Sequence, residues 1–316
     1  MPLHVEPILP HFGAECSGLD LTRPLSPEEV RQVTDAMDKY GVTVWRNTGM
    51  TDEQHVEFSR NFGYLERVPK REGVKMRLPF RELFDASNLT VDGEITRDKA
   101  AIEYRKGDRL WHTDSAFLDK RTSYSLLLAH QVPKQGGETW FADTRTAYDD
   151  LPQETKDFIE DKFTLNSLWW SRKQAGAEIA EEEIDERPKA RHPLVHVHKG
   201  SGRKALFIAA HTMDIEGMDK AEGRKLIADL IAHCTQPKYV FSVKWNVGDM
   251  VIWDNLCSMH RGGDFDYSNE KRDMRRTTVR EGTEPHTMET GDDPFTELFA
   301  RTPKTVDIQG ARYSGR

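Results

Sequence analysis

The sequence reads Met250-Val-Ile-Trp-Asp-Asn255 and, after a short link, Met259-His-Arg-Gly262. The residues Met250–Trp253 are all apolar and include two β-branched side chains, a pattern that predicts a buried strand. Upstream, Lys238–Trp245 has the composition of a second strand, and the polar segment Asn246–Asp249 is typical of a turn. We therefore predict a β-hairpin of Lys238–Trp245 and Met250–Trp253, with His260 just beyond the end of its sheet.

Other strands and helices are predicted on both sides of this hairpin. Strands are expected at Val42–Arg46, Ser123–Ala129, Glu138–Phe141 and Arg275–Arg280, and helices at Pro27–Tyr40, Thr51–Phe62, Pro152–Asp161 and Asp219–Cys234. The first helix has Ser26 and Glu29 for a capping box and Gly41 for its end. Regular βαβ alternation is missing, and no G-x-G-x-x-G follows a strand, so a dinucleotide-binding fold has no support. We predict a mainly β protein with flanking helices, arranged as an antiparallel sandwich or barrel.

The domain organisation follows from length and polarity. With 316 residues, the chain suits one large domain, which we place at residues 1–285. Within it, Ser171–Arg191 is polar and contains the acidic run Glu178–Glu186, so we expect an inserted loop or lid with little core. Residues 286–316 are rich in charge, Gly and Pro, and we expect an extended or partly ordered polar tail.

Charge and composition exclude several classes of protein. Lys and Arg number 45 against 53 Asp and Glu, a formal charge of −8, so we expect no nucleic-acid or membrane partner. There is no run of about 18 apolar residues, and Met1–Pro10 lacks the pattern of a signal peptide, so we expect a cytoplasmic protein. Cys16, Cys234 and Cys257 lie far apart, which argues against a disulfide scaffold and a thiolate zinc site.

The first candidate for chemistry is Trp111-His-Thr-Asp114, because residues i and i+2 of an extended strand point to one side. His112 and Asp114 would then converge, and His260 could supply a third ligand. Two histidines and one carboxylate form the facial triad of non-haem Fe(II) oxygenases. Taken singly, each has a plainer interpretation: a solvated loop pair for His112 and Asp114, and a hydrogen-bonded core histidine for His260.

Two arginines follow His260 in Lys271-Arg-Asp-Met-Arg-Arg-Thr-Thr278. In a strand, Arg272 and Arg276 would share a face and Arg275 would point the other way. Guanidinium groups beside a metal site are costly to bury without anions, and arginine binds carboxylates through paired hydrogen bonds. The pattern indicates a site for two anionic groups; a solvated basic edge strand is the alternative interpretation.

Several motifs together resemble the taurine/2,4-dichlorophenoxyacetate dioxygenase family of Fe(II)- and 2-oxoglutarate-dependent enzymes. They are Trp111–Asp114, Gly136-Gly-Glu-Thr139, Phe141-Ala-Asp143 with Arg145, Trp253-Asp-Asn255, His260-Arg-Gly262 and Arg272–Thr278, in the order and spacing of the family. The resemblance extends from about Leu9 to Glu281. The segments Asp85–Asn88, Gly200–Lys204 and Trp245–Asp249 resemble the 2,4-dichlorophenoxyacetate branch more than the taurine branch.

This resemblance implies a double-stranded β-helix, also called a jelly roll, and a role for each matching residue. The implied Fe(II) ligands and catalytic residues are His112, Asp114 and His260; the residues implied for the distal carboxylate of 2-oxoglutarate are Thr139 and Arg272; those implied for the substrate are Arg276, at its anionic group, His211 and Asn88. Arg145 is expected to be structural and paired with a carboxylate.

The resemblance also implies a reaction. With O₂, the enzyme would hydroxylate a small carboxylate-bearing, aryloxyalkanoate-like substrate and release succinate and CO₂. Asp114 favours hydroxylation over halogenation, because halogenating relatives have a small residue there. We expect a homo-oligomer, a dimer or higher, as in relatives. Three alternatives stay open: a sulfonate or sulfate-ester dioxygenase of the same family, a non-catalytic cupin-like or sugar-binding barrel, and a zinc hydrolase.

Overall fold

The computed structural model describes residues 2–69 and 75–288. Its largest sheet has seven strands in the order β1-β2-β3-β13-β5-β15-β4, and only β2 and β3 pair in parallel. These strands are β1 (His4–Pro7), β2 (Ala14–Ser17), β3 (Val42–Trp45), β13 (Met250–Asp254), β5 (Thr122–Gln131), β15 (Asp273–Arg280) and β4 (Phe84–Asp85). The expected strands in β3, β5 and β15 are thus present.

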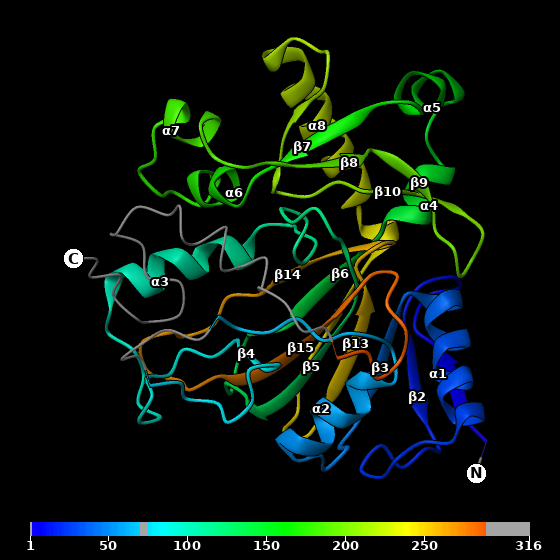
Figure 1. Ribbon diagram of the computed structural model, residues 1–316, viewed down its shortest axis with the longest axis vertical. Helices are drawn as coiled ribbons and strands as arrows, with labels where there is room; N and C mark the ends of the chain where they lie inside the picture. The colour runs from blue at the N-terminus through cyan, green and yellow to red at the C-terminus, as the bar shows by residue number, and fades with distance from the viewer. Residues whose placement is uncertain (1, 70–74, 289–316) are drawn as a thin grey trace.

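A smaller antiparallel sheet packs against one face of the large sheet (Figure 1). Its order is β12 (Val240–Val243), β6 (Thr139–Asp143) and β14 (Ser258–Gly262). One apolar core lies between the two sheets, with Phe141 and Phe241 from the small sheet against Leu127 and Trp253 from the large one. Two sheets that share a core, with helices outside them, confirm the prediction of a mainly β protein with flanking helices.

The predicted hairpin of Lys238–Trp245 and Met250–Trp253 is wrong. Strand β12 pairs with β6 in the small sheet, whereas β13 lies between β3 and β5 in the large sheet. The link between them is held by Asp249, which accepts the backbone N–H of Asn246 and forms an ion pair of 2.7 Å with Arg46. Both strands are apolar, and packing face to face in different sheets buries their side chains in a shared core.

Two helices cover the outer face of the large sheet. Helix α1 (Pro27–Tyr40) begins with the predicted capping box of Ser26 and Glu29 and ends at Gly41, whose φ is 68°. Helix α2 (Asp52–Arg60) begins with a capping box at Thr51 and ends two residues before the predicted Phe62. Alternate residues of β5 face opposite ways: Leu126 and Leu128 contact the helix side, and Leu127 faces the small sheet.

A third region, coloured green to yellow in Figure 1, lies beyond the small sheet. It contains β11 (Thr212–Ile215), β7 (Phe163–Asn166) and β8 (Ala190–Pro193) in one sheet, β9 (Val195–Val197) with β10 (Lys204–Leu206), the helices α4 (Thr144–Asp149), α5 (Gln153–Ile159) and α8 (Lys220–Cys234), and the short helix η2 (Pro237–Tyr239). The helices predicted at 152–161 and 219–234 are present as α5 and α8.

The loop or lid with little core predicted at Ser171–Arg191 is corrected by the structure. The segment contains most of α6 (Leu168–Gln174) and all of α7 (Glu181–Asp185). Trp169 and Ile184 are 1% and 0% exposed and share an apolar cluster with Leu118 and Met213. Trp169, just before the segment, and Ile184, within it, therefore anchor the two helices in an apolar cluster. The α3 (Lys99–Arg105) and η1 (Lys106–Arg109) helices follow each other nearby, and η1 packs against α6.

Two further points concern the predicted organisation. Most of the predicted tail, at 289–316, lies outside the described residues.

Among the helices of the described ranges, none has both the length and the apolar character that a membrane crossing requires.

Candidate metal centre

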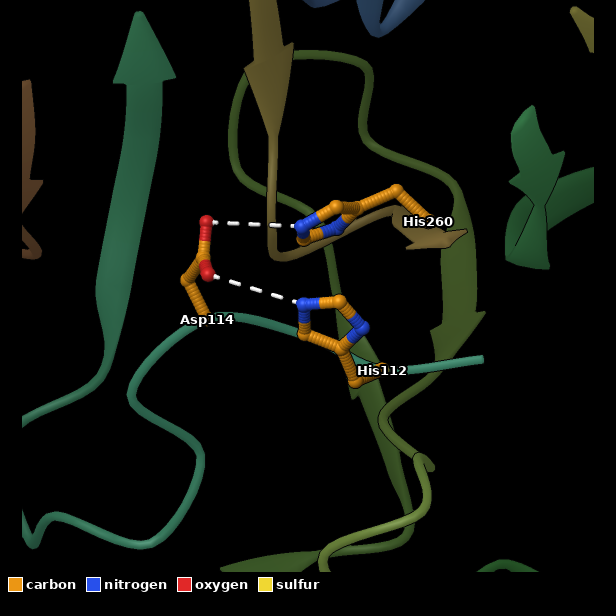
Figure 2. A group of neighbouring side chains, drawn as sticks. All are labelled: His112, Asp114 and His260. Carbon is orange, nitrogen blue, oxygen red and sulfur yellow. Dashed lines mark ion pairs between the residues drawn. The ribbon is translucent and has the colours of Figure 1, made fainter. Parts of the chain in front are cut away.

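His112, Asp114 and His260 meet at the edge of the small sheet (Figure 2), with ligand atoms that all lie within 4.8 Å of one another. His112 is not in a strand. It forms a single bridge with His260 through reciprocal backbone hydrogen bonds of 2.9 and 2.8 Å, and Asp114 lies in the turn that follows. His260 lies within β14, not beyond the end of a sheet. Pairing across the sheet edge, rather than strand periodicity alone, brings the ligands together.

Both imidazoles present Nε2 to this point. The Nδ1 of His112 lies 2.8 Å from the carbonyl of Leu110, which accepts its proton and leaves Nε2 with a free lone pair. Nε2 of His112 and Nε2 of His260 are 3.9 and 3.6 Å from the Asp114 carboxylate. Burial lowers the pKa of His260 well below its usual value, and the charge of His112 lowers it further. A neutral imidazole is the form that binds a metal.

Asp114 is held as a carboxylate. Burial by itself raises its pKa, but the charges of Arg276 and of the two imidazoles, with a hydrogen bond from Ser125, hold the pKa below the usual value. The Ser125 hydroxyl donates to Oδ2 at 2.7 Å, and Arg276 Nη1 lies 2.5 Å from Oδ1. The backbone N–H of Asp114 donates to Asn255 Oδ1, and the Asn255 amide donates in turn to Ser125.

These residues fit a divalent ion. Two neutral nitrogens and one carboxylate on one side of a point form a donor set that first-row divalent metals accept. The Nε2–oxygen separations are too long for hydrogen bonds between the ligands, and Nδ1 of His260 is a buried atom without a partner among the described residues. The positions opposite the three ligands face a cavity of about 590 Å³.

All of the other predicted site residues line this cavity: Thr139, Arg272, Arg276, His211 and Asn88. Thr139 begins β6, is 3% exposed, and accepts a hydrogen bond of 3.0 Å from the Trp245 indole N–H. Arg272 directly precedes β15, and its Nη1 donates to the Ala86 carbonyl at 3.3 Å. Within the described ranges, no carboxylate forms an ion pair with Arg272, and burial lowers its pKa. A buried, unpaired guanidinium is expected to take an anion.

Arg275 and Arg276 point to opposite faces, as predicted for a strand. Arg276 lies in the cavity against Asp114 and against the ring of Phe84, 4.8 Å from the ring centroid. Arg275 pairs with Asp52 and Asp273 on the other face. Arg276 therefore already has one carboxylate partner at the metal centre.

His211 and Asn88 differ in whether their polar atoms have hydrogen-bond partners within the protein. The ring of His211 lies 6.1 Å from that of His112 and 5.1 Å from Phe117, and its Nδ1 has no partner in the described parts of the chain. The Asn88 amide is fully engaged: it donates to the carbonyls of Tyr267 and Glu270 and accepts the backbone N–H of Arg272 at 2.8 Å. Asn88 lines the cavity, but its hydrogen bonds hold the chain that carries Arg272.

Sequence reasoning missed several residues that support the site. Ser125 and Asn255 orient Asp114, and Glu66 and Arg172 line the cavity. Asn255 belongs to the quoted motif Trp253-Asp-Asn255, which was the available signal. The others come from segments with no distinctive pattern, so only the fold brings them to the site.

A second group of possible ligands is structural. His198, Asp254 and Cys257 lie close enough to share an ion, but their polar atoms already pair with protein. Nε2 of His198 is 2.8 Å from Asp254 Oδ2, and its Nδ1 accepts the backbone N–H of Ser201. Burial raises the pKa of Cys257 well above its usual value, so it stays a thiol. Nearby, Arg145 pairs with the carboxylate of Asp143, as predicted.

Comparison with known proteins adds a second line of argument. Residues 4–278 match the family described as taurine catabolism dioxygenase TauD, TfdA family. An α-ketoglutarate-dependent 2,4-dichlorophenoxyacetate dioxygenase of Burkholderia sp. (strain RASC) is 40% identical over 285 residues, 88% of this chain and 95% of that protein. An (S)-phenoxypropionate/α-ketoglutarate dioxygenase of Sphingobium herbicidovorans is 30% identical over 277 residues, 84% of this chain and 91% of its own.

A solved structure supports the same relationship. The crystal structure of AAD-2 in complex with Mn(II) and N-oxalylglycine superimposes with a TM-score of 0.82 at 41% sequence identity, covering 91% of this chain and all of that one. The family match spans most of the chain and includes the buried His112, Asp114 and His260. The chain therefore belongs to the TauD/TfdA family of dioxygenases.

Proposed function

We propose that this dioxygenase uses Fe(II) and 2-oxoglutarate to hydroxylate an aryloxyalkanoate-like acid. The observation that carries the proposal is that one cavity contains both the His112, Asp114 and His260 group and Arg272, which has no carboxylate partner among the described residues. The relatives from Burkholderia and Sphingobium, whose names include aryloxy acids, support this class of substrate.

The three proposed ligands would hold Fe(II) on one side and leave the cavity side open. Bound there with 2-oxoglutarate, the metal supplies oxidative chemistry that converts 2-oxoglutarate and O₂ to succinate and CO₂ and adds one oxygen atom to a substrate C–H bond. Leu110 keeps the His112 ring in the tautomer that exposes Nε2 to the metal. Ser125 and Asn255 keep the Asp114 carboxylate turned toward the same point.

Thr139 and Arg272 would bind the distal carboxylate of 2-oxoglutarate. A guanidinium and a hydroxyl on one carboxylate replace the water that the anion loses on burial. Trp245 donates to the Thr139 oxygen, so the hydroxyl proton of Thr139 is free to donate to the co-substrate. Asn88 would act indirectly here, through its hydrogen bond to the Arg272 backbone.

Arg276 would bind the carboxylate of the substrate while keeping contact with Asp114. His211, neutral because burial lowers its pKa, would offer its unpartnered Nδ1 to an oxygen of the substrate. Together these groups position the C–H bond beside the metal and exclude water. For an aryloxyacetate, a hydroxyl on the carbon next to the ether oxygen gives a hemiacetal that collapses to a phenol and glyoxylate.

Three finer points belong to the same proposal. The seven-stranded sheet and the β12-β6-β14 sheet are proposed to form the two walls of a double-stranded β-helix, since they share one core. Residues 1–285 are proposed as a single dioxygenase domain. The protein is proposed to assemble as a dimer or a higher homo-oligomer.

The experiment that tests the function is release of succinate from 2-oxoglutarate under O₂ with Fe(II) and ascorbate. It is run without a substrate and with phenoxyacetate, a chlorinated phenoxyacetate, a phenylpropanoid acid and taurine. We expect an aryloxy acid to stimulate succinate release, with phenol formed in equal amount. Hydrolysis of an ester or amide that needs Zn²⁺ and neither O₂ nor 2-oxoglutarate would instead indicate a hydrolase.

Two other outcomes would change the proposal. Stimulation by taurine or a sulfate ester alone would keep the mechanism and replace the carboxylate by a sulfur oxyanion, which Arg276 can also bind. No succinate under any condition, with metal shown to be bound, would support a non-catalytic barrel.

A further inference from the structure

Arg172, on α6, is a buried cation that the proposed mechanism does not use. It is 9% exposed and lines the same cavity as the metal centre. Its Nε atom is buried and has no hydrogen-bond partner among the residues that the structure describes. The side chain is held by packing: its guanidinium lies 4.1 Å from the Tyr104 ring centroid.

Three other arginines whose side chains are largely covered have close carboxylates. Arg77, Arg145 and Arg276 each have a carboxylate oxygen within 3.3 Å. For Arg172 the ion pair is to Asp108 at 3.9 Å, and the Asp108 side chain is 55% exposed. Burying a guanidinium without an anion at hydrogen-bond distance is costly. Tyr104 forms a hydrogen bond with Arg172, but, as at Arg272, no carboxylate of the described residues lies within hydrogen-bond distance of the guanidinium.

Arg172 approaches His211 from α6, which forms one side of the cavity. His211 lies beside His112, and Phe117 lies beside His211. Burial lowers the pKa of His211, and the charges of His112 and then Arg172 lower it further, so Arg172 is within electrostatic reach of His211. Phe117 and Leu168 line the cavity as well, so an aromatic ring has apolar walls beside it.

The guanidinium is also fixed in place. A Cβ added at Gly107 in η1 would lie 1.7 Å from Arg172 Nη1, so the guanidinium lies directly against the Gly107 backbone and would have to move if a larger residue stood there. Figure 1 shows α6 above α3, and η1 packs against α6. The two elements that enclose Arg172 are thus fitted around it, which is the preorganisation expected of a binding group.

We propose that Arg172 binds a second anionic group of the substrate, at the end of the cavity remote from the metal. The inference rests on the proposed function and names the substrate class more closely. The natural substrate is an aromatic acid with two anionic oxygen groups: one carboxylate at Arg276, beside the carbon that is oxidised, and one on the far side of the ring, at Arg172.

The test compares three substrates on the Fe(II)-loaded enzyme: phenoxyacetate, 4-chlorophenoxyacetate and 4-carboxyphenoxyacetate. The chloro compound fills space without a charge, so it controls for size. A hydrogen bond to a charged group corresponds to about a tenfold effect or more. We expect kcat/KM for the carboxy compound to exceed that for the chloro compound by at least about tenfold, with the 3-carboxy isomer measured alongside.

The variant Arg172→Gln should reduce this ratio to about one, and Arg172→Lys should restore part of it, because lysine keeps the charge but loses the planar donor pair. Arg187→Gln is the matched control. Arg187 also stacks on an aromatic ring, at 4.3 Å from the Trp169 centroid, but does not line the cavity. It should leave the ratio as in the wild type.

The outcomes separate this inference from the proposed function. Turnover of phenoxyacetate with no preference for either carboxy isomer would overturn the role of Arg172 and leave the dioxygenase standing. An equal loss for all substrates in Arg172→Gln, with a lower Tm, would show that Arg172 only joins α6 to η1. If no aryloxyacetate is turned over, the proposed function itself fails. If Arg172→Gln does not fold, the wild-type comparison of the chloro and carboxy compounds still decides.

Discussion

Side chains at the metal centre are held by neighbours that carry no chemistry themselves. Leu110 fixes the tautomer of His112, and Ser125 and Asn255 fix the carboxylate of Asp114. Leu110 and Asn255 accept hydrogen bonds from the ligand residues and Ser125 donates one, and such supporting contacts commonly set how well a metal ligand binds. The geometry of three ligands therefore depends on at least as many residues that never touch the metal.

Arg272 and Arg276 are expected to affect different kinetic constants. Arg272→Ala should raise KM for 2-oxoglutarate by about tenfold or more and change KM for the substrate less, because only Arg272 lacks a carboxylate partner among the described residues. Arg276→Ala should do the reverse. Steady-state kinetics with each reactant varied in turn measure both values.

The control for these two variants is Arg275→Ala. Arg275 neighbours Arg276 in β15 but pairs with Asp52 and Asp273 on the opposite face. It should lower stability without changing either KM. Equal increases in both KM values for Arg272→Ala and Arg276→Ala would show that the two roles are not divided as proposed.

Glu66 is expected to make stability depend on pH. Burial raises its pKa to about 7, against hydrogen bonding by Ser115 and the charges of Arg280 and Arg276, which lower it. Because the pKa is higher in the folded state, its contribution is fully present below the unfolded pKa of 4.5 and is lost as pH rises through about 7. The shift corresponds to roughly 3 kcal/mol in the free energy of unfolding.

Urea denaturation of metal-free protein between pH 4 and 8 measures this effect. Glu66→Gln keeps the hydrogen-bond acceptor for Ser115 and removes the titration. The mutant should therefore gain stability relative to the wild type as pH rises from 4.5 toward 8. Parallel curves for the two proteins would contradict the shifted pKa of Glu66.

At the scale of elements, the sequence predicts where helices begin and end more reliably than it predicts which strands pair. The capping box predicted at Ser26 is present, and a second capping box forms at Thr51, where the other helix was predicted to begin; both form between residues three apart. Strands β12 and β13 were recognised as strands but assigned to each other. A strand can pair with another strand at any distance along the chain, and the alternation of its side chains does not indicate which strand that is.

The turn from α1 to β3 provides a test of packing at an element boundary. Gly41 has φ of 68°, and an added Cβ would lie 3.0 Å from both Arg145 Nη2 and Cys257 Sγ. Gly49 has almost the same φ, 67°, but an added Cβ there meets nothing within 4 Å. Gly49→Ala should cost about 1 kcal/mol from backbone strain alone, and Gly41→Ala about 1–3 kcal/mol more from crowding. Urea denaturation of both variants measures the difference, and equal losses would show that the neighbours of Gly41 move aside freely.

At the scale of the whole molecule, the metal joins segments that are far apart in the sequence. His112 and His260 approach from different parts of the chain, so an ion that binds them should favour the folded state by mass action. At about 100 times Kd, the gain is about 2.7 kcal/mol. Adding Mn(II), which is stable in air, with 2-oxoglutarate should therefore raise Tm by roughly 5 °C.

Asp114→Ala should abolish this thermal shift, and turnover with it, while far-ultraviolet circular dichroism shows a retained fold. Asp249→Ala is the control, because Asp249 is equally buried and paired with an arginine but lies away from the cavity. It should start from a lower Tm and still respond to the metal. A full metal response in Asp114→Ala would remove Asp114 from the ligand set.

The class of fold, the helices with local caps and the chemical character of the candidate site can all be predicted from the sequence. Motifs such as His112-Thr-Asp114 and Arg272–Thr278 are short, and their chemically important residues are neighbours in the chain. They can therefore be recognised in a single sequence. Even there, the physical reason given for convergence was incomplete: His112 meets His260 through a bridge between segments rather than through the period of one strand.

Three features depend on contacts between distant parts of the chain: the sheets that β12 and β13 join, the burial of Trp169 and Ile184 by α6 and α7, and the set of side chains that complete the cavity. Asn88 was predicted from its motif to contact the substrate, but its amide forms hydrogen bonds with backbone groups near Arg272. Arg172 lies in a polar stretch with no motif at all. Burial and hydrogen-bond saturation depend on residues distant in sequence, so they arise only when the whole chain is folded.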